Sequence, residues 1–160
     1  MTEIAKARPV AELKPGADPR AYPDRPWVGV GVVVWRGDEF LLIQRGKPPR
    51  LGEWSIPGGG QELGETVRDT AIREVREETG VEIAGGGLID VVDSVRRDAH
   101  GRVAFHITLV DFAARWVSGE AVPGDDAMGV GWFRLDDLPK LGLWAETVRV
   151  IRESQSLVPL

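Results

Sequence analysis

The segment from Gly59 to Val81 constrains this chain more than any other part of its sequence. It begins in a glycine run and continues into a stretch with the marks of a capped helix, because Thr66 is a suitable N-cap and Gly80 stands where a C′ glycine would end the helix. Asp69 follows Thr66 at the spacing of a capping box, with Asp in place of Glu. The sequence therefore predicts a glycine-rich loop followed by a helix over residues 66–79.

The predicted helix carries Glu74, Glu77 and Glu78, and this spacing places all three on one face. That face lies beside an apolar stripe formed by Val67, Ala71, Ile72 and Val75. Like charges one turn apart repel, and carboxylates beside a core face lose hydration, so a divalent cation bound to the clustered oxygens would relieve the conflict. A solvated acidic face, supported by an ion pair between Arg73 and Glu77, is the alternative that the helix alone leaves open.

Composition narrows the choice of metal and of partner. The chain has no cysteine and only two histidines, so a metal would be held mainly by oxygen, as Mg²⁺, Mn²⁺ and Ca²⁺ are. The net charge of −5 argues against binding of bulk nucleic acid, although a metal can bridge the protein to a phosphorylated small molecule. No apolar stretch is long enough to span a membrane or to form a signal peptide, so we expect a cytoplasmic protein without a membrane partner.

The whole segment resembles the Nudix box, G-x5-E-x7-R-E-U-x-E-E-x-G-U, in which U is an aliphatic residue. Every defined position is matched, by Gly59, Glu65, Arg73, Glu74, Val75, Glu77, Glu78, Gly80 and Val81. The resemblance implies the Nudix fold, an α/β fold in which a mixed β-sheet is sandwiched between α-helices. It also implies an enzyme that hydrolyses a pyrophosphate bond in a nucleoside diphosphate linked to another group.

The resemblance also implies a metal site. Glu74, Glu77 and Glu78 would ligate Mg²⁺, with Mn²⁺ as a substitute, and a backbone carbonyl near Gly58 or Gly59 would add a further ligand. Glycines suit this bend because backbone must approach the ion and the phosphates closely.

The same resemblance assigns further catalytic roles within and beyond the box. Arg73 would hold a box glutamate by an ion pair, and Glu65 would assist at the metal site or order the loop. The general base would be a box glutamate such as Glu77 or an acidic residue of a later loop. The loop candidates are Glu120, Asp125 and Asp126. Ordinary solvated acids in a turn are the alternative for these three.

Basic residues are expected near the substrate phosphates. We choose Arg45 and Arg50 for this role, beside the backbone of Gly58 and Gly59, because in Nudix relatives the second strand and its following loop usually face the cleft. Plain surface charge is the alternative for each arginine. Arg97 and Arg102 are further candidates in the later polar segment.

The remaining pattern predicts one domain over residues 27–154, a proline-rich arm over 1–26 and a tail over 155–160. Strands are predicted at 28–36, 40–45, 54–56, 88–92, 103–112 and 131–134, a helical turn at 135–138 and a closing helix at 144–154. The arm would be either a flexible tail or an ordered segment that packs on a partner subunit. A homodimer is therefore one expectation.

The sequence leaves the substrate open within the family. ADP-ribose pyrophosphatases often carry a proline about 15 residues beyond the box, and residues 94–98 contain none. The general pattern nevertheless favours ADP-ribose or a nucleotide sugar. A nucleoside triphosphate, as in sanitising enzymes, is the first alternative. A non-catalytic nucleotide-binding module is the second, and the intact glutamates argue against it.

Overall fold

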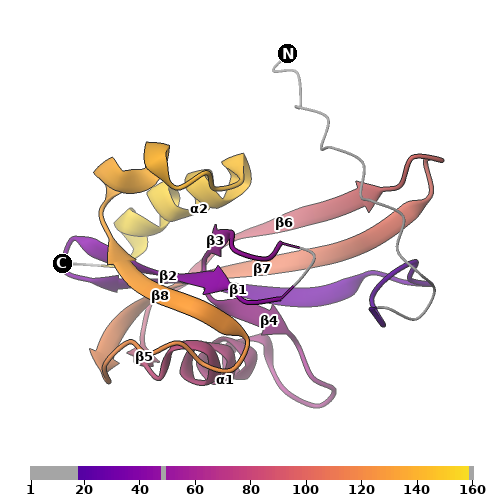
Figure 1. The fold of residues 1–160 in the computed structure, drawn as a ribbon. Coiled ribbons are helices and arrows are strands. Elements are labelled where there is room, and N and C mark those ends of the chain that lie inside the picture. The colour runs from indigo at the N-terminus through magenta and orange to yellow at the C-terminus, as the bar shows by residue number, and fades with distance from the viewer. Residues whose placement is uncertain (1–17, 48–49, 159–160) are drawn as a thin grey trace.

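A computed structural model of the chain, which describes residues 18–47 and 50–158, shows a mixed sheet with one helix on each face (Figure 1). The strands are β1 (Trp27–Arg36), β2 (Glu39–Arg45), β3 (Trp54–Ser55), β4 (Gly58–Gly60), β5 (Glu82–Ala84), β6 (Leu88–Arg97), β7 (Val103–Ser118) and β8 (Ala127–Phe133). The helices are α1 (Val67–Thr79) and α2 (Ala145–Ser154), with 3-10 turns at Leu135–Lys140 and Gln155–Leu157. The expected α/β/α architecture is confirmed.

Strand β1 organises the sheet. Along one edge it pairs in parallel with β7, from Trp27 opposite Ile107 to Trp35 opposite Arg115. Its other edge is divided, because β2 pairs antiparallel with the end of β1 while β4 pairs antiparallel with Gly29–Gly31. The division brings the glycine run of β4 against the N-terminal half of β1.

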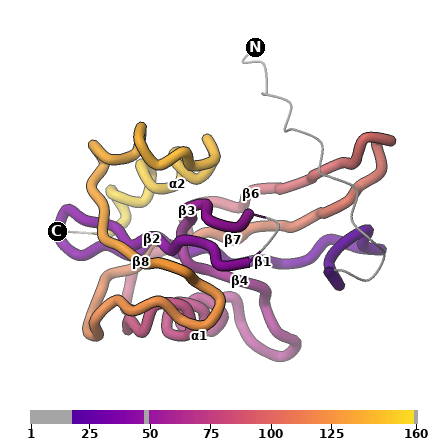
Figure 2. Tube along the Cα trace, in the orientation of Figure 1, coloured from indigo at the N-terminus to yellow at the C-terminus, as the bar shows by residue number. Residues whose placement is uncertain are grey.

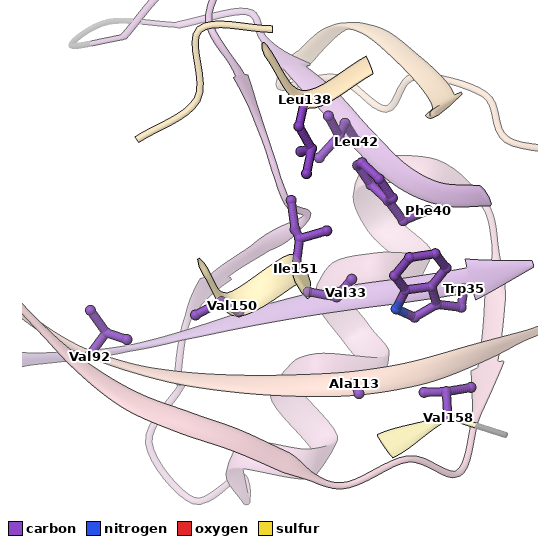
Figure 3. Packing of buried hydrophobic residues seen from close by; sticks show 10 residues of the cluster. All are labelled: Val33, Trp35, Phe40, Leu42, Val92, Ala113, Leu138, Val150, Ile151 and Val158. Carbon is purple, nitrogen blue, oxygen red and sulfur yellow. The ribbon is translucent and has the colours of Figure 1, made fainter. Parts of the chain in front are cut away.

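The alternation of β1 side chains builds a core on each side of the sheet. Val30, Val32 and Val34 pack toward α1, in a cluster with Ala71 and Val75. On the opposite face lies a second cluster, shown in Figure 3, which contains Val33, Trp35, Phe40, Leu42, Val92, Ala113, Leu138, Val150, Ile151 and Val158. Two clusters separated by one sheet fix α1 and α2 in place on opposite faces.

Helix α1 begins and ends as predicted. The Thr66 side chain accepts a hydrogen bond from the Asp69 backbone N–H, the reciprocal bond is present, and Gly80 is left-handed with φ 71°. The predicted apolar stripe is partly wrong, because Ile72 is 39% exposed. Buried Thr79 belongs to the inner face, where its hydroxyl donates to the Val75 carbonyl over 2.6 Å. A hydroxyl satisfied within the helix can be buried, which an apolar pattern does not indicate.

Several strands differ in extent from the predicted ones. β6 continues to Arg97 and β7 to Ser118, and β8 begins at Ala127. β4 and β5 were not predicted as strands. Both are short and contain few residues with high β-propensity. They become strands through pairing with β1 and β7, which the sequence pattern does not reveal.

Residues 18–26 of the predicted arm pack on the chain itself. The Tyr22 backbone N–H donates to the Ala104 carbonyl over 2.8 Å, and the Tyr22 hydroxyl donates to Asp98 over 3.0 Å. Figure 2 shows this indigo segment beside the far ends of β6 and β7. The rest of the arm, residues 1–17, and the end of the tail, 159–160, lie outside the described residues. None of the helices in the described part of the chain is long and apolar enough to cross a membrane.

Candidate active site

The site is built where β4 meets the C-terminal half of α1. The Gly58 backbone N–H donates to Glu78 Oε2 over 2.9 Å. A Cβ at Gly59 would collide with the Glu74 carboxylate, and one at Gly58 would collide with the Val30 carbonyl. Glycine at position 58 therefore lets β4 lie against the backbone of β1, and glycine at position 59 leaves the space that the Glu74 carboxylate occupies.

Arg73 joins the acidic residues into one network. Its Nε and Nη2 donate to Glu65 over 3.1 and 2.7 Å. Its Nη1 donates to Glu74 over 2.8 Å and to Glu77 over 3.2 Å, and Nη2 also reaches the Gly60 carbonyl over 3.0 Å. The hydrogen bond from Arg73 holds the pKa of Glu65 down at about 2. One guanidinium thus fixes three carboxylates and the loop that precedes the helix.

Glu74 and Glu78 differ electrostatically from Glu65, because the pKa of each is raised rather than lowered. The pKa of Glu78 is raised to about 7, chiefly by burial; the charges of Glu74 and Asp126 act in the same direction, while the hydrogen bond from Gly58 and the charge of Arg45 act against it. Burial also raises the pKa of Glu74. These two half-buried carboxylates repel each other, so a cation bound between them would stabilise their ionised forms.

The donors at this site fit a divalent cation such as Mg²⁺ or Mn²⁺. All are oxygens, two carboxylates lie beside the loop backbone, and Glu77 stands on the open side with 60% of its side chain exposed. Within residues 18–47 and 50–158, no three acidic or histidine side chains converge as a preformed metal cage. Glu74 and Glu77 are instead both paired with the guanidinium of Arg73.

A cleft of about 250 Å³ opens beside the glycine run, over the α2-facing side of the sheet. Its floor includes Gly29 and Gly31 of β1, and Gly58–Gly60 form one border. Both Arg45 and Arg50 line it, as the sequence predicted. Their contact with substrate phosphates stays a prediction.

The loop of residues 119–126 packs on the end of α1. Its Gly124 backbone N–H donates to the Glu78 carbonyl over 2.8 Å. Asp126 lies close enough to raise the pKa of Glu78 and forms an ion pair with Lys47. Glu120 instead places its backbone carbonyl near Gly80, at the C-terminal end of the helix. The loop therefore brings Asp126, rather than Glu120, to the carboxylate cluster.

Sequence reasoning missed three residues that line the cleft, namely Arg20, Arg96 and Asp111. Asp111 is 5% exposed, and burial raises its pKa to about 6. An acidic residue directly between apolar Val110 and Phe112 in a predicted strand was the available signal for Asp111. Arg20 gave no such signal, because only the packing of Tyr22 brings it to the cleft.

Comparisons with known proteins agree with this geometry. The family model described as NUDIX domain matches residues 25–153. An ADP-ribose pyrophosphatase of Methanocaldococcus jannaschii is 36% identical over 123 residues, which is 77% of this chain and 70% of the relative. The NAD-capped RNA hydrolase NudC of Pseudomonas aeruginosa is 40% identical over 113 residues, which is 69% of this chain but 37% of that protein. The chain thus spans only about a third of that second relative.

A solved structure supports the fold in the same way. The MutT NUDIX hydrolase of Burkholderia pseudomallei superposes with a TM-score of 0.71 at 33% identity, and the match covers 81% of this chain and 98% of that one. Sequence family and architecture therefore agree over the same region.

Proposed function

The chain belongs to the Nudix hydrolase family, and from that premise we propose that it hydrolyses the pyrophosphate bond of ADP-ribose, or of a related nucleoside diphosphate sugar, with Mg²⁺ or Mn²⁺. The observation that carries the proposal is the network in which Arg73 orders Glu65, Glu74 and Glu77 beside half-buried Glu78. The name of the Methanocaldococcus jannaschii relative supports the choice of substrate.

We assign the metal ligands to Glu74, Glu77 and Glu78, with the Gly59 carbonyl as a further donor. A bound divalent cation would supply charge neutralisation for the diphosphate and a lower pKa for the attacking water. The Gly58 N–H and Arg73 hold the two inner carboxylates in place, so that little reorganisation is needed during the reaction.

The remaining groups bind substrate and accept the proton. Arg45 and Arg50 would donate to phosphate oxygens from the cleft wall. The proton acceptor would be Glu77, which is open to solvent, or Asp126, which lies by Glu78. Glu120 is the weaker loop candidate because of its place beside Gly80.

Product analysis with a substrate panel tests the proposal. The full chain is incubated with Mg²⁺ and ADP-ribose, nucleotide sugars, dinucleoside polyphosphates or nucleoside triphosphates, and products are separated chromatographically. We expect AMP and ribose 5-phosphate from ADP-ribose, and loss of turnover by at least about a hundredfold in Glu77→Gln and Glu78→Gln. Glu82→Gln is the matched control, because Glu82 pairs with Arg76 on the surface.

Two outcomes would contradict the proposal. Cleavage of nucleoside triphosphates alone would reassign the chain to the sanitising type of activity. No turnover of any diphosphate, with Mn²⁺ tried as well as Mg²⁺, would exclude the proposed hydrolysis.

The proposal extends to a homodimer. β6 pairs only with β7 among the described strands, and Leu88, Val91 and Val95 are exposed along it. An open strand edge with apolar side chains favours association with a second copy. Light scattering during size-exclusion chromatography should give twice the chain mass, and the mass of one chain would contradict the dimer.

A further inference from the structure

The cleft is closed at its two ends by different parts of the chain. Strand β7 runs along its floor from Phe105 to Asp111. Helix α2 covers the Asp111 end, because Arg149 of α2 donates to Asp90, the β6 partner of Asp111. Tyr22 packs on the Phe105 end, and Figure 1 shows its indigo segment and α2 toward opposite ends of the sheet. Residues 18–26 are therefore an end wall of the cleft.

Tyr22 fastens this end wall through three contacts. Its backbone N–H donates to the Ala104 carbonyl over 2.8 Å, and its hydroxyl donates to Asp98 over 3.0 Å. The Arg102 guanidinium lies 5.0 Å from the centre of its ring and also donates to Asp98 over 2.8 Å. Tyr22 has a φ of 50°, which residues other than glycine rarely adopt unless surrounding contacts hold them there. The position of the end wall is thus fixed on β7 and on the turn after β6.

The end wall brings Arg20 to the border of the cleft. Asp18 accepts hydrogen bonds from Nε and Nη2 of Arg20 over 3.1 and 2.9 Å, which fixes the plane of the guanidinium. No acceptor within the described part of the chain reaches its Nη1. Because Asp18 balances the charge, the pair presents oriented N–H donors rather than net positive charge. Such donors suit an acceptor atom of an uncharged group.

Arg45 lies between this pair and the carboxylate cluster. The charge of Arg45 acts on the pKa of Glu78 and also on the pKa of Asp18, which it lowers. Arg20 in turn acts on the pKa of Arg45. A pyrophosphate bound beside the glutamates would therefore meet Arg45 first, and a group attached to that pyrophosphate would meet Arg20.

We propose that the end wall completes the substrate site: Arg20 donates from Nη1 to a substrate acceptor atom outside the pyrophosphate, and Tyr22 is the positioning residue that holds Arg20 there. The inference rests on the proposed function and adds a binding residue to it. The family model matches from residue 25, so Arg20 and Tyr22 lie outside the shared region. The acceptor belongs to the nucleoside or to the group on the other phosphate, since both carry uncharged oxygen acceptors.

Calorimetry in the presence of a chelator tests the contact without hydrolysis. The full chain is titrated with ADP-ribose, and Arg20→Gln should weaken binding by about tenfold, the effect of one hydrogen bond from a charged donor. Arg25→Gln is the matched control, because Arg25 belongs to the same end wall but is 79% exposed and pairs with adjacent Asp24. It should stay within about twofold of the wild type. Unchanged binding in Arg20→Gln, or equal losses in both variants, would overturn the proposal.

The two halves of the substrate identify the acceptor. AMP and ribose 5-phosphate are titrated separately under the same conditions. Arg20→Gln should weaken one of them by at least about fivefold and leave the other within about twofold. Equal weakening of both would mean that Arg20 acts on the phosphate they share, and unchanged binding of both would mean that it contacts neither. Either result would contradict a contact outside the pyrophosphate.

A double-mutant cycle tests the positioning role of Tyr22. Tyr22→Ala removes the hydroxyl and the ring, and should raise KM for ADP-ribose by about tenfold with kcat within about twofold. In the Arg20→Gln background the same change should raise KM by no more than about twofold, because Arg20 is the group that Tyr22 positions. Tyr22 lies outside both main core clusters, so we expect the variant to fold, which circular dichroism checks.

The outcomes of the cycle separate this inference from the proposed function. Effects of the two substitutions that multiply, or a fall in kcat alone, would show that Tyr22 only stabilises the fold. Turnover of ADP-ribose with a wild-type KM in Tyr22→Ala would refute the positioning role and leave the proposed function standing. Binding of ADP-ribose that depends on Arg20, without any turnover, would do the reverse.

Discussion

At the residue scale, Arg73 is the side chain on which most of the candidate site depends. Its nitrogens reach Glu65, Glu74 and Glu77 together, a geometry that a planar five-donor guanidinium can make and an ammonium cannot. Arg73 touches neither the reacting atoms nor the cleft surface in this arrangement, so we treat it as a positioning residue.

Replacement of Arg73 by lysine tests this positioning role. Arg73→Lys should lower kcat on ADP-ribose by about a hundredfold, because misplaced carboxylates lose most of their catalytic effect, with KM changed much less. Arg76→Lys is the control, because Arg76 lies on the same helix but its side chain pairs only with partly exposed Glu82 among the described residues. It should leave both constants near the wild-type values. A rise in KM with kcat intact would contradict the role.

Asp111 makes the stability of the chain depend on pH. Its folded pKa of about 6 lies above the usual value of 3.8, so the folded state holds the proton more tightly and stability falls as pH rises between these values. The wild type should lose about 3 kcal/mol of unfolding free energy between about pH 4 and pH 7 relative to Asp111→Asn. Denaturant unfolding at several pH values measures the difference, with exposed Asp93→Asn as control. Parallel pH curves for wild type and Asp111→Asn would contradict this account.

At the scale of elements, the helix that carries the glutamates is specified locally. Its two caps could be predicted from Thr66 and Gly80 because each cap is a contact between near neighbours in sequence. Glu74 and Glu78 inherit their shared face from helical spacing alone. The carboxylate-bearing side of the site therefore follows from the sequence without knowledge of the rest of the fold.

The N-cap provides a stability test at this scale. Thr66→Ala removes the acceptor for the Asp69 backbone N–H and should lower the free energy of unfolding by about 1 kcal/mol. Thr66→Ser keeps the oxygen and should lose only a few tenths of that amount. The two variants would be compared by urea denaturation, and equal losses would show that the cap does not stabilise α1.

At the scale of the whole molecule, the cleft wall shows what the sequence could not predict. Arg45 ends a recognisable strand, so its place by the cleft could be anticipated from the family. Arg20 and Arg96 lie far apart in sequence and meet Arg45 only through long-range pairing of β6 with β7 and docking of Tyr22 on β7. Contacts of that kind depend on the register of the sheet, which one sequence does not reveal.

The two groups of candidate site residues lie on opposite faces of the sheet. The α1 side holds the carboxylates, while the α2 side forms the cleft and its arginines. The glycine run of β4 joins the two, because it touches Glu74 and Glu78 on one side and borders the cleft on the other. Cation and substrate would therefore meet at this loop.

Mn²⁺ binding measured by electron paramagnetic resonance tests the central claim, that the carboxylates of α1 hold the catalytic cation. The account predicts that the full chain binds Mn²⁺, that Glu78→Gln weakens this binding by at least about tenfold, and that Glu82→Gln does not. Binding that is unchanged in Glu78→Gln, or lost equally in Glu82→Gln, would contradict the placement of the metal at this site.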